Sequence, residues 1–229
     1  MWGVGMTAFI SNAPTLSRLL LVRHAHTSMA GKFCGHCDPP LSVQGRAELV
    51  ELNRRLSEES FEFVFCSDLL RARETSESIA AARSLIVRQR RDLRELAFGE
   101  WEGLDWDEIE TRDPAYAKRW LETYPCLAAP GGEAFATFQR RIEHAMNAIA
   151  DDSLNGSAVV VTHAGVIRTF LQNIAPSQCG SLNRQVLTYG SCWEIWRQGG
   201  DWTFASANRL GVSPHQGSRQ LATASGRES

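Results

Sequence analysis

The chain has 229 residues, enough to bury one good hydrophobic core, so we expect one domain and one active site. Its 24 lysines and arginines nearly balance 26 aspartates and glutamates, and the net charge of -2 leaves no basic field of the kind that holds a nucleic-acid backbone. No apolar run approaches the roughly 20 residues that cross a bilayer. We expect a cytoplasmic protein with a flexible tail over residues 1–17, no nucleic-acid partner and no membrane contact.

Apolar runs typical of strands buried on both faces alternate with segments whose apolar residues recur at helical spacing. The expected strands are residues 19–23, 61–66, 85–87 and 158–162, followed by a hairpin of strands 192–197 and 202–205. The expected helices run from a Ser42 cap to residues 57–60, from a Ser67 or Asp68 cap to about residue 83, over 133–150 and over 166–174. This alternation predicts an α/β fold with a mainly parallel central sheet flanked by helices on both faces.

Two histidines occupy equivalent places in this pattern, because His24 directly follows the first strand and His163 directly follows the strand at 158–162. In parallel sheets, ligands bind outside the carboxyl ends of the strands, where helix N-termini present N–H groups to anions. Arg23 and Arg71 add planar guanidinium groups that suit phosphate oxygens. The pattern predicts a phosphate site. The alternatives are satisfied loop histidines and, for Arg71, a solvated charge on a helix.

Four segments resemble, in order, the signature blocks of the histidine phosphatase superfamily, which is also called the phosphoglycerate mutase-like family. These blocks are residues 20–25 (LLVRHA), 66–72 (CSDLLRA), 93–103 (LRELAFGEWEG) and 161–168 (VTHAGVIR). With residues 39–42 and 130–133 the match spans residues 19–209, and ordered blocks are more specific than one short motif. The resemblance implies a phosphoglycerate mutase-like domain over 18–210 with a small helical cap at about 105–131.

The resemblance also implies a role for each matching residue. His24 matches the nucleophile, which is phosphorylated and then hydrolysed, and Glu95 matches the proton donor to the leaving alcohol. The expected catalytic residues are His24, Glu95 and His163, and the expected phosphate-binding residues are Arg23, Arg71 and Thr27. A neutral imidazole is a competent nucleophile, and neighbouring arginines keep it neutral by lowering its pKa. The alternative for Glu95 is a simple ion pair with Arg94 or Arg91.

The sequence departs from the family pattern at three positions close to His24. Ala25 replaces the usual glycine, His26 a glutamate or glutamine, and Ala30 an asparagine that often contacts phosphate. One phosphate ligand is therefore missing, or is supplied by Thr27, Ser28 or the loop 31–37. The pattern around these positions is similar to the α-ribazole phosphatase-like group rather than to the glycolytic mutases.

The resemblance implies a metal-independent phosphatase without cofactors that hydrolyses a small phosphorylated metabolite, with α-ribazole 5′-phosphate as one candidate. The alternatives are a phosphoglycerate mutase-type phosphotransferase and an inactive phosphate-binding module. The short stretch between Glu95 and His163 favours water over a second substrate as the acceptor, and a binding module needs no proton donor. The sequence is compatible with a homodimer.

Two further features of the sequence allow an alternative interpretation. Cys34-Gly35-His36-Cys37 resembles the redox-active site of protein disulfide isomerases, but Pro39 and Pro40 prevent the helix that activates such a thiol, so we expect neither dithiol chemistry nor a zinc site. Aromatic residues of the cap could stack on a nucleotide-like leaving group, but we favour their packing the cap onto the sheet. They are Trp101, Trp106, Tyr116, Trp120 and Tyr124. The polar residues 211–229 are expected to be disordered.

Overall fold

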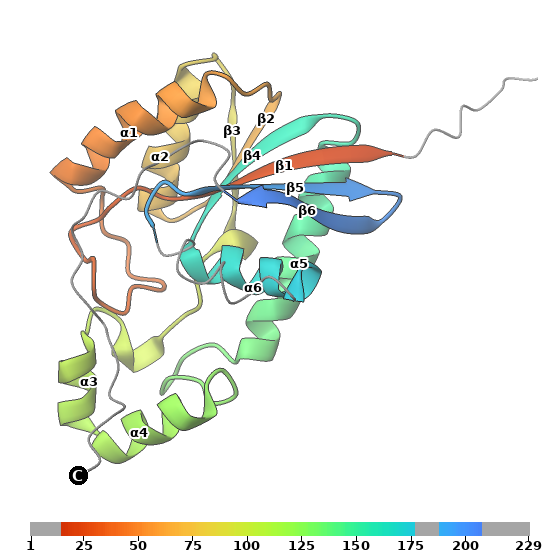
Figure 1. The fold of residues 1–229 in the computed structure, drawn as a ribbon. Coiled ribbons are helices and arrows are strands. Elements are labelled where there is room, and N and C mark those ends of the chain that lie inside the picture. Colours follow the sequence, from red (N-terminus) through yellow and green to blue (C-terminus); the bar gives the residue numbers. More distant parts are fainter. Residues whose placement is uncertain (1–14, 177–187, 208–229) are drawn as a thin grey trace, which may run out of the picture.

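The structure, a computed structural model, describes residues 15–176 and 188–207, and in them six strands form one sheet in the order β3-β2-β4-β1-β5-β6. The strands are β1 Leu16–Arg23, β2 Phe63–Ser67, β3 Val87–Arg90, β4 Ser157–Thr162, β5 Cys192–Gln198 and β6 Asp201–Ala207. The first four are mutually parallel, whereas β5 is antiparallel to β1, and β6 to β5 (Figure 1). The predicted mainly parallel sheet with an edge hairpin is confirmed.

Helices cover both faces of this sheet, as predicted. They are α1 Val43–Leu56, α2 Leu70–Ala81, α3 Trp106–Arg112, α4 Pro114–Thr123, α5 Phe135–Asp152 and α6 Ala164–Ile174, with short 3-10 turns at Arg91–Leu93 and Gly99–Trp101. Successive side chains of a strand point to opposite faces. Leu19 and Leu21 accordingly pack with α5 and α6, whereas Leu20 and Val22 pack with α1 and α2. Figure 1 shows these two pairs of helices on the two faces of the sheet. None of the described helices is long and apolar enough to span a bilayer.

The N-terminal caps of two helices show how far local sequence determines them. Ser42 caps α1 as predicted, since its hydroxyl accepts a hydrogen bond from the N–H of Gly45. The prediction that Ser67 or Asp68 caps the next helix is wrong, because α2 begins at Leu70 and its N–H donates to the carboxylate of Asp38. A residue distant in the sequence therefore supplies this cap.

Two boundaries also differ from the prediction. The chain turns at the end of α2, where the N–H of Leu85 donates to the carbonyl of Ala80, so β3 begins at Val87 rather than at residue 85. β1 begins at Leu16, and buried Ser17 donates its hydroxyl to the carbonyl of Ala150, so both residues belong to the sheet rather than to the tail. The first 14 residues of the predicted N-terminal tail, and all of the predicted C-terminal tail 211–229, lie outside the described residues.

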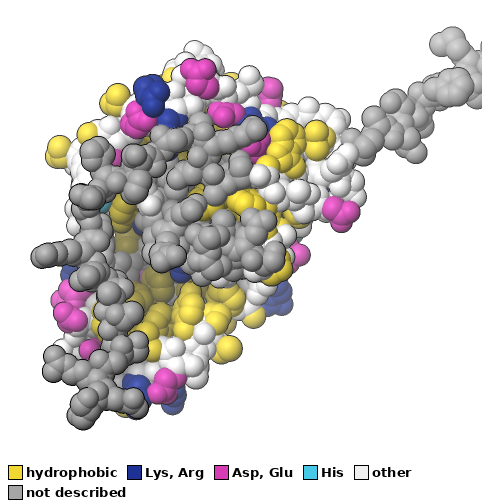
Figure 2. Space-filling view, in the orientation of Figure 1, with side chains coloured by type: hydrophobic (Ala, Val, Ile, Leu, Met, Phe, Trp, Pro, Cys, Tyr) yellow, Lys and Arg dark blue, Asp and Glu magenta, His cyan; other side chains and the backbone are white. Residues whose placement is uncertain are grey.

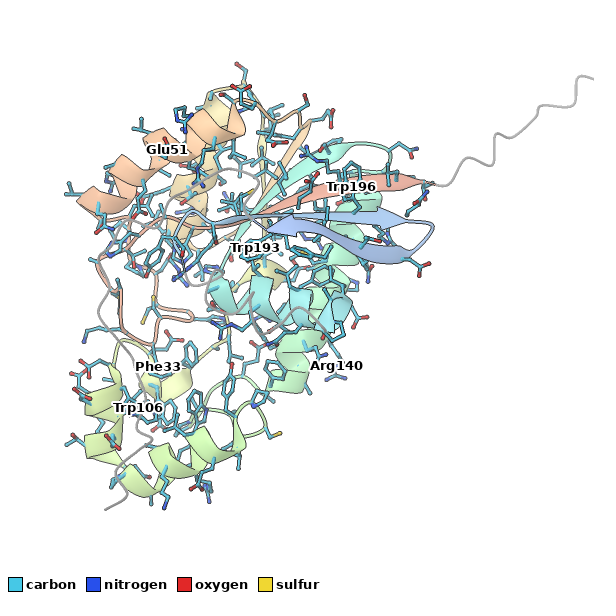
Figure 3. The ribbon with its side chains drawn as sticks, in the orientation of Figure 1. Phe33, Glu51, Trp106, Arg140, Trp193 and Trp196 are labelled. Atoms are coloured by element: carbon cyan, nitrogen blue, oxygen red, sulfur yellow. The ribbon has the colours of Figure 1, made fainter. Side chains whose placement is uncertain are left out.

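The helices α3 and α4 form a cap with its own small core, on the side of the molecule towards which β1 runs (Figure 1). Trp101 and Ile109 are buried in this core, and Phe33 from the loop after β1 packs against them, with its ring facing Trp106 (Figure 3). Four of the five cap aromatics named above thus pack within the cap itself, rather than packing the cap onto the sheet as predicted. The fifth, Tyr124, faces the cavity described below.

Candidate active site

A cavity of about 540 Å³ opens where β1 and β4 end. Five of the six predicted site residues line it, namely Arg23, His24, Thr27, Arg71 and Glu95. The sixth, His163, lies beneath the cavity, with its ring centroid 5.1 Å from that of His24. The structure therefore brings together all the residues that the sequence selected, because the carboxyl ends of parallel strands meet at one edge of the sheet.

His24 has a defined tautomer. Its side chain is buried, and Nδ1 lies 2.8 Å from the carbonyl oxygen of Ala25, an arrangement in which Nδ1–H donates and Nε2 carries the lone pair. Burial lowers the pKa of His24 well below its usual value, and the positive charges of Arg71 and Arg23 lower it further. At neutral pH the ring is therefore neutral and Nε2 is a base.

His163 is the more unusual of the two histidines. Its side chain is completely buried, and neither ring nitrogen has a hydrogen-bond partner among the described residues. Burial, followed by the charge of Arg71, lowers the pKa of His163 well below its usual value. Leaving a buried N–H without an acceptor costs about 1–3 kcal/mol. The buried ring of His163 therefore keeps an unsatisfied polar group next to His24.

The guanidinium groups of Arg23 and Arg71 are held in different ways. That of Arg23 lies 3.8 Å from the ring centroid of Tyr189, which also contacts the ring of His24. Arg71 is 1% exposed, so the alternative of a solvated helix charge is wrong. It donates three hydrogen bonds to the carbonyls of the loop 34–37. Among the described residues these bonds use three of its five N–H groups, so two can donate to a ligand.

Glu95 is anchored by backbone amides rather than by an arginine. Its carboxylate accepts hydrogen bonds from the N–H groups of Gly165, at 2.8 Å, and Leu96, at 2.9 Å. The alternative of an ion pair with Arg94 is wrong, because Arg94 makes a bidentate pair with Asp68. A side chain at Gly165 would place its Cβ 2.1 Å from Oε1 of Glu95, so only glycine permits this contact.

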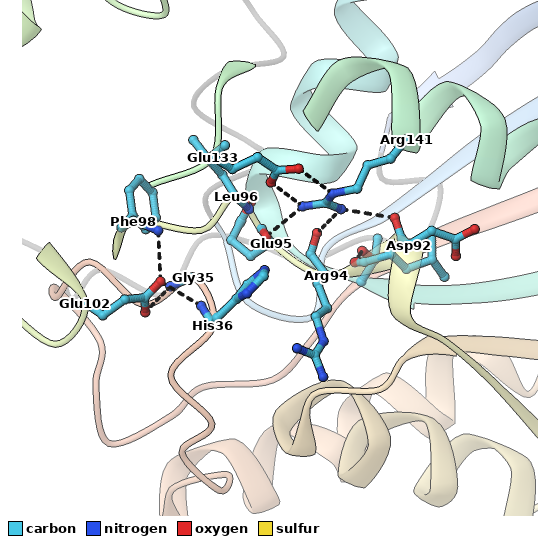
Figure 4. Close-up of polar contacts among 12 residues, drawn as sticks. Gly35, His36, Asp92, Arg94, Glu95, Leu96, Phe98, Glu102, Glu133 and Arg141 are labelled. Atoms are coloured by element: carbon cyan, nitrogen blue, oxygen red, sulfur yellow. Dashed lines mark hydrogen bonds and ion pairs between the residues drawn. The ribbon is translucent and has the colours of Figure 1, made fainter. Parts of the chain in front are cut away.

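The Cys-Gly-His-Cys tetrapeptide is a structural loop. Glu102 accepts hydrogen bonds from the N–H groups of Gly35, His36 and Cys37, and from that of Phe98 (Figure 4). Burial alone would raise the pKa of Glu102, but these backbone bonds outweigh it and keep the pKa below its usual value. Glu102 thus holds the N–H groups of the loop, and Arg71 holds its carbonyls.

The chemistry of the two thiols in this loop also differs from that of a redox site. Burial raises the pKa of Cys34, and burial together with the Glu102 carboxylate raises the pKa of Cys37 to about 11. Both are protonated at neutral pH, whereas a redox-active thiol needs a lowered pKa. Within residues 15–176 and 188–207, no three histidine, cysteine or acidic side chains converge as metal ligands. The zinc alternative has no support there.

The residues that depart from the family pattern are accommodated in different ways. Ala25 is fully buried and its N–H donates to the hydroxyl of Thr75, so its methyl group fits without displacing the strand end. His26 turns towards α1, where Nδ1 lies 2.8 Å from the hydroxyl of Ser42. Thr27 is buried and lines the cavity.

Apolar and aromatic side chains, which we call the aromatic wall, make up much of the cavity lining. Figure 2 shows hydrophobic side chains gathered on the face between α6 and α4. Those that line the cavity are Met29, Phe33, Leu96, Phe98, Tyr124, Pro125, Phe135 and Phe138. The polar residues Arg168, Thr169 and Gln172 of α6 also line it. A cavity lined by both cationic and aromatic side chains suits a ligand with an anionic head and an apolar body.

Sequence analysis missed Tyr189 as a residue of this site. It is placed by the pairing of β5 with β1, in which the N–H of Gly190 donates to the carbonyl of Arg23. That pairing joins segments far apart in the sequence, so no local pattern announces it. The sequence offered one signal only, an aromatic residue three positions before a predicted strand.

The two buried histidines should make stability depend on pH. Below a pH of about 6.5 the unfolded chain binds protons that the folded rings do not, so the free energy of unfolding should fall by about 1 kcal/mol per histidine between pH 6.5 and pH 5.5. Urea unfolding at these two pH values should show this loss, reduced by about half in His163→Gln. Replacing exposed His144 on α5 with glutamine should leave it unchanged. An equal loss in wild type and His163→Gln would contradict the assignment.

A parallel sheet that presents two buried histidines and a set of arginines to one cavity is typical of α/β proteins that handle phosphoryl groups. The model of the histidine phosphatase superfamily (branch 1) matches residues 19–209, and the chain belongs to this family.

Its relatives include phosphatases and mutase-like proteins. The chain is 29% identical over 178 residues to the adenosylcobalamin/alpha-ribazole phosphatase of Salmonella typhimurium, covering 77% of this chain and 88% of the relative. It is 35% identical over 174 residues to phosphoglycerate mutase-like protein 4 of Arabidopsis thaliana, covering 74% and 76%. The crystal structure of a putative alpha-ribazole-5′-P phosphatase from Escherichia coli superposes with a TM-score of 0.77, at 25% identity, over 89% of this chain and 100% of that one.

Proposed function

We propose that this protein is a phosphatase that hydrolyses a small phosphomonoester through a phosphohistidine intermediate on His24. One observation carries the proposal. The bond between Nδ1 of His24 and the carbonyl of Ala25 leaves the Nε2 lone pair to face a cavity that Arg23 and Arg71 also line. A neutral nucleophile among cations meets the two requirements of attack on a phosphate dianion, which are an available electron pair and relief of charge repulsion. Membership of the histidine phosphatase superfamily supports the same reaction.

In the first step, Nε2 of His24 attacks phosphorus and the bond from phosphorus to the ester oxygen breaks. Glu95, in its protonated form, gives its proton to the departing oxygen. In the second step Glu95 takes a proton from water, the resulting hydroxide attacks phosphorus, and the bond between phosphorus and Nε2 breaks to release inorganic phosphate. Arg23, Arg71 and His163 stabilise the charge on the remaining phosphoryl oxygens throughout.

The leaving group that the cavity suits is aromatic or otherwise apolar. The aromatic wall would stack on such a group, whereas it gives little to a small sugar acid. We therefore propose α-ribazole 5′-phosphate, or a metabolite of similar shape, as the substrate, in keeping with the relative from Salmonella typhimurium. A phosphoglycerate mutase-type phosphotransferase is the alternative, and it predicts transfer of the phosphoryl group to an acceptor with little release of phosphate.

The reaction is tested by acid quenching followed by mass spectrometry after brief incubation with p-nitrophenyl phosphate in EDTA. A phosphoryl adduct should appear on His24 in the wild type and be absent in His24→Ala. Glu95→Gln should accumulate the adduct, because p-nitrophenolate leaves without a proton but water then lacks its base. Folded wild-type protein that forms no adduct and releases no phosphate would contradict the proposal and favour a binding module.

The substrate is tested separately, by comparing kcat/KM for α-ribazole 5′-phosphate with that for p-nitrophenyl phosphate. We expect kcat/KM to be higher for α-ribazole 5′-phosphate, although its leaving group is poorer. The reason is that contacts between the enzyme and the whole leaving group lower the barrier. If it is hydrolysed no better than p-nitrophenyl phosphate, the substrate assignment is wrong while the reaction class stands.

A further inference from the structure

The backbone that carries Glu95 is held from behind by an arginine of α5. The guanidinium of Arg141 donates from Nη1 to the carbonyls of Asp92, at 3.1 Å, and Arg94, at 2.7 Å, and from Nη2 to the carbonyl of Glu95 itself, at 2.9 Å (Figure 4). One side chain therefore fixes three carbonyls of the short segment that ends at Glu95.

Arg141 is itself held in place. Glu133 receives two parallel hydrogen bonds from it, one from Nε at 2.8 Å and one from Nη2 at 2.7 Å, and the guanidinium lies 4.7 Å from the ring centroid of Phe138 (Figure 4). All five N–H groups of the guanidinium are thus donated to protein acceptors. Glu133 is anchored in turn, because its N–H donates to the carbonyl of Ala97 at 2.9 Å.

This arrangement divides the support of Glu95 between two helices. Gly165 on α6 holds the carboxylate, and Arg141 on α5 holds the backbone carbonyl. Arg141 does not line the cavity that Glu95 lines, so it can act on a substrate only through residues that do, which are Glu95 and Phe138. Because all donors of this guanidinium are bonded to protein acceptors, none is left to bind a ligand. The same hydrogen bonds can instead hold the backbone of Glu95 in a fixed orientation.

We infer that Arg141, fixed by Glu133, is a positioning residue for the acid Glu95, an inference that rests on the proposed function. Its loss would let the segment 92–95 shift while leaving His24, Arg23 and Arg71 in place. Misplacement of a catalytic group by about 1 Å can cost on the order of 100-fold in rate. The loss should therefore fall on the step that needs the proton of Glu95.

The test compares two monoesters of similar size whose leaving groups differ in their need for a proton. Benzyl phosphate releases an alkoxide that must be protonated, whereas p-nitrophenyl phosphate releases a stable phenolate. For Arg141→Met we expect kcat/KM for benzyl phosphate to fall by about 10- to 100-fold and that for p-nitrophenyl phosphate to fall by less than about 3-fold. The ratio of kcat/KM values cancels any change in the fraction of folded enzyme.

Matched variants separate positioning from stability. Arg140→Met changes the neighbouring exposed arginine of α5, which points away from the segment 92–95, and should leave both substrates unaffected (Figure 3). Glu133→Gln keeps the shape of the partner but removes its charge, and should give a smaller loss with the same selectivity for benzyl phosphate. This second variant also serves if Arg141→Met does not fold.

Glu95→Gln supplies the reference for selectivity. If Glu95→Gln loses activity selectively on benzyl phosphate but the Arg141 and Glu133 variants lose it equally on both esters, or not at all, the inference about Arg141 is overturned. If Glu95→Gln itself shows no selectivity, the proposed role of Glu95 is wrong, and the inference falls with it. A selective loss in all three variants supports both.

Discussion

Replacing His24 with alanine is expected to lower kcat for phosphomonoester hydrolysis by a factor on the order of 10³ or more. The variant loses the atom that forms the covalent intermediate of the proposed reaction. Arg23 and Arg71 remain, so inorganic phosphate should still bind with a Kd within about 10-fold of the wild-type value. Steady-state kinetics and isothermal titration calorimetry with phosphate check the two expectations.

A matched control makes this result specific to His24. Exposed His144 lies on α5, away from the cavity, and His144→Ala should retain wild-type kcat. Near-ultraviolet circular dichroism establishes that each variant is folded. A folded His24→Ala enzyme with kcat within about 10-fold of the wild type would rule out His24 as the nucleophile, since removal of a covalent catalyst costs far more than that.

The parts of the fold that could be predicted are those that local sequence controls. The buried strands were evident because β1 and β4 are covered on both faces and therefore read as continuous apolar runs, and Ser42 sits directly before the helix that it caps. The cap of α2 could not be predicted in the same way. Asp38 lies 32 residues before the N–H that it accepts from, and the sequence carries no sign of the loop that brings them together.

The same distinction applies to the site. His24 and His163 were predictable because each ends a parallel strand, and such ends converge. Arg141 and Glu102 were not, because each acts on a loop that only the tertiary fold brings within reach: Arg141 on the segment before Glu95, and Glu102 on the Cys-Gly-His-Cys loop. A resemblance built from short blocks finds the groups that would touch the substrate and misses those that hold them in place.

Replacing Gly165 with alanine is the second change for which we expect a large loss of activity. Replacing it with alanine places a Cβ 2.1 Å from Oε1 of Glu95, a separation that no real contact tolerates, so the carboxylate must leave its bond with the N–H at position 165. We expect kcat/KM for benzyl phosphate to fall by about 100-fold, within the range that general acid catalysis contributes. Stability should change by no more than about 1 kcal/mol, because alanine is the better helix former at the start of α6.

A double-mutant cycle separates this clash from any general damage to α6. In Glu95→Ala the carboxylate is gone, so adding Gly165→Ala should lower kcat/KM by less than about 3-fold, although the same change in wild type lowers it by about 100-fold. This result would show that the loss in Gly165→Ala arises from the contact between position 165 and Glu95. If the two penalties multiply instead, the methyl group acts elsewhere, for example on the neighbouring His163, and the need for glycine at this position has a different cause from the seating of Glu95.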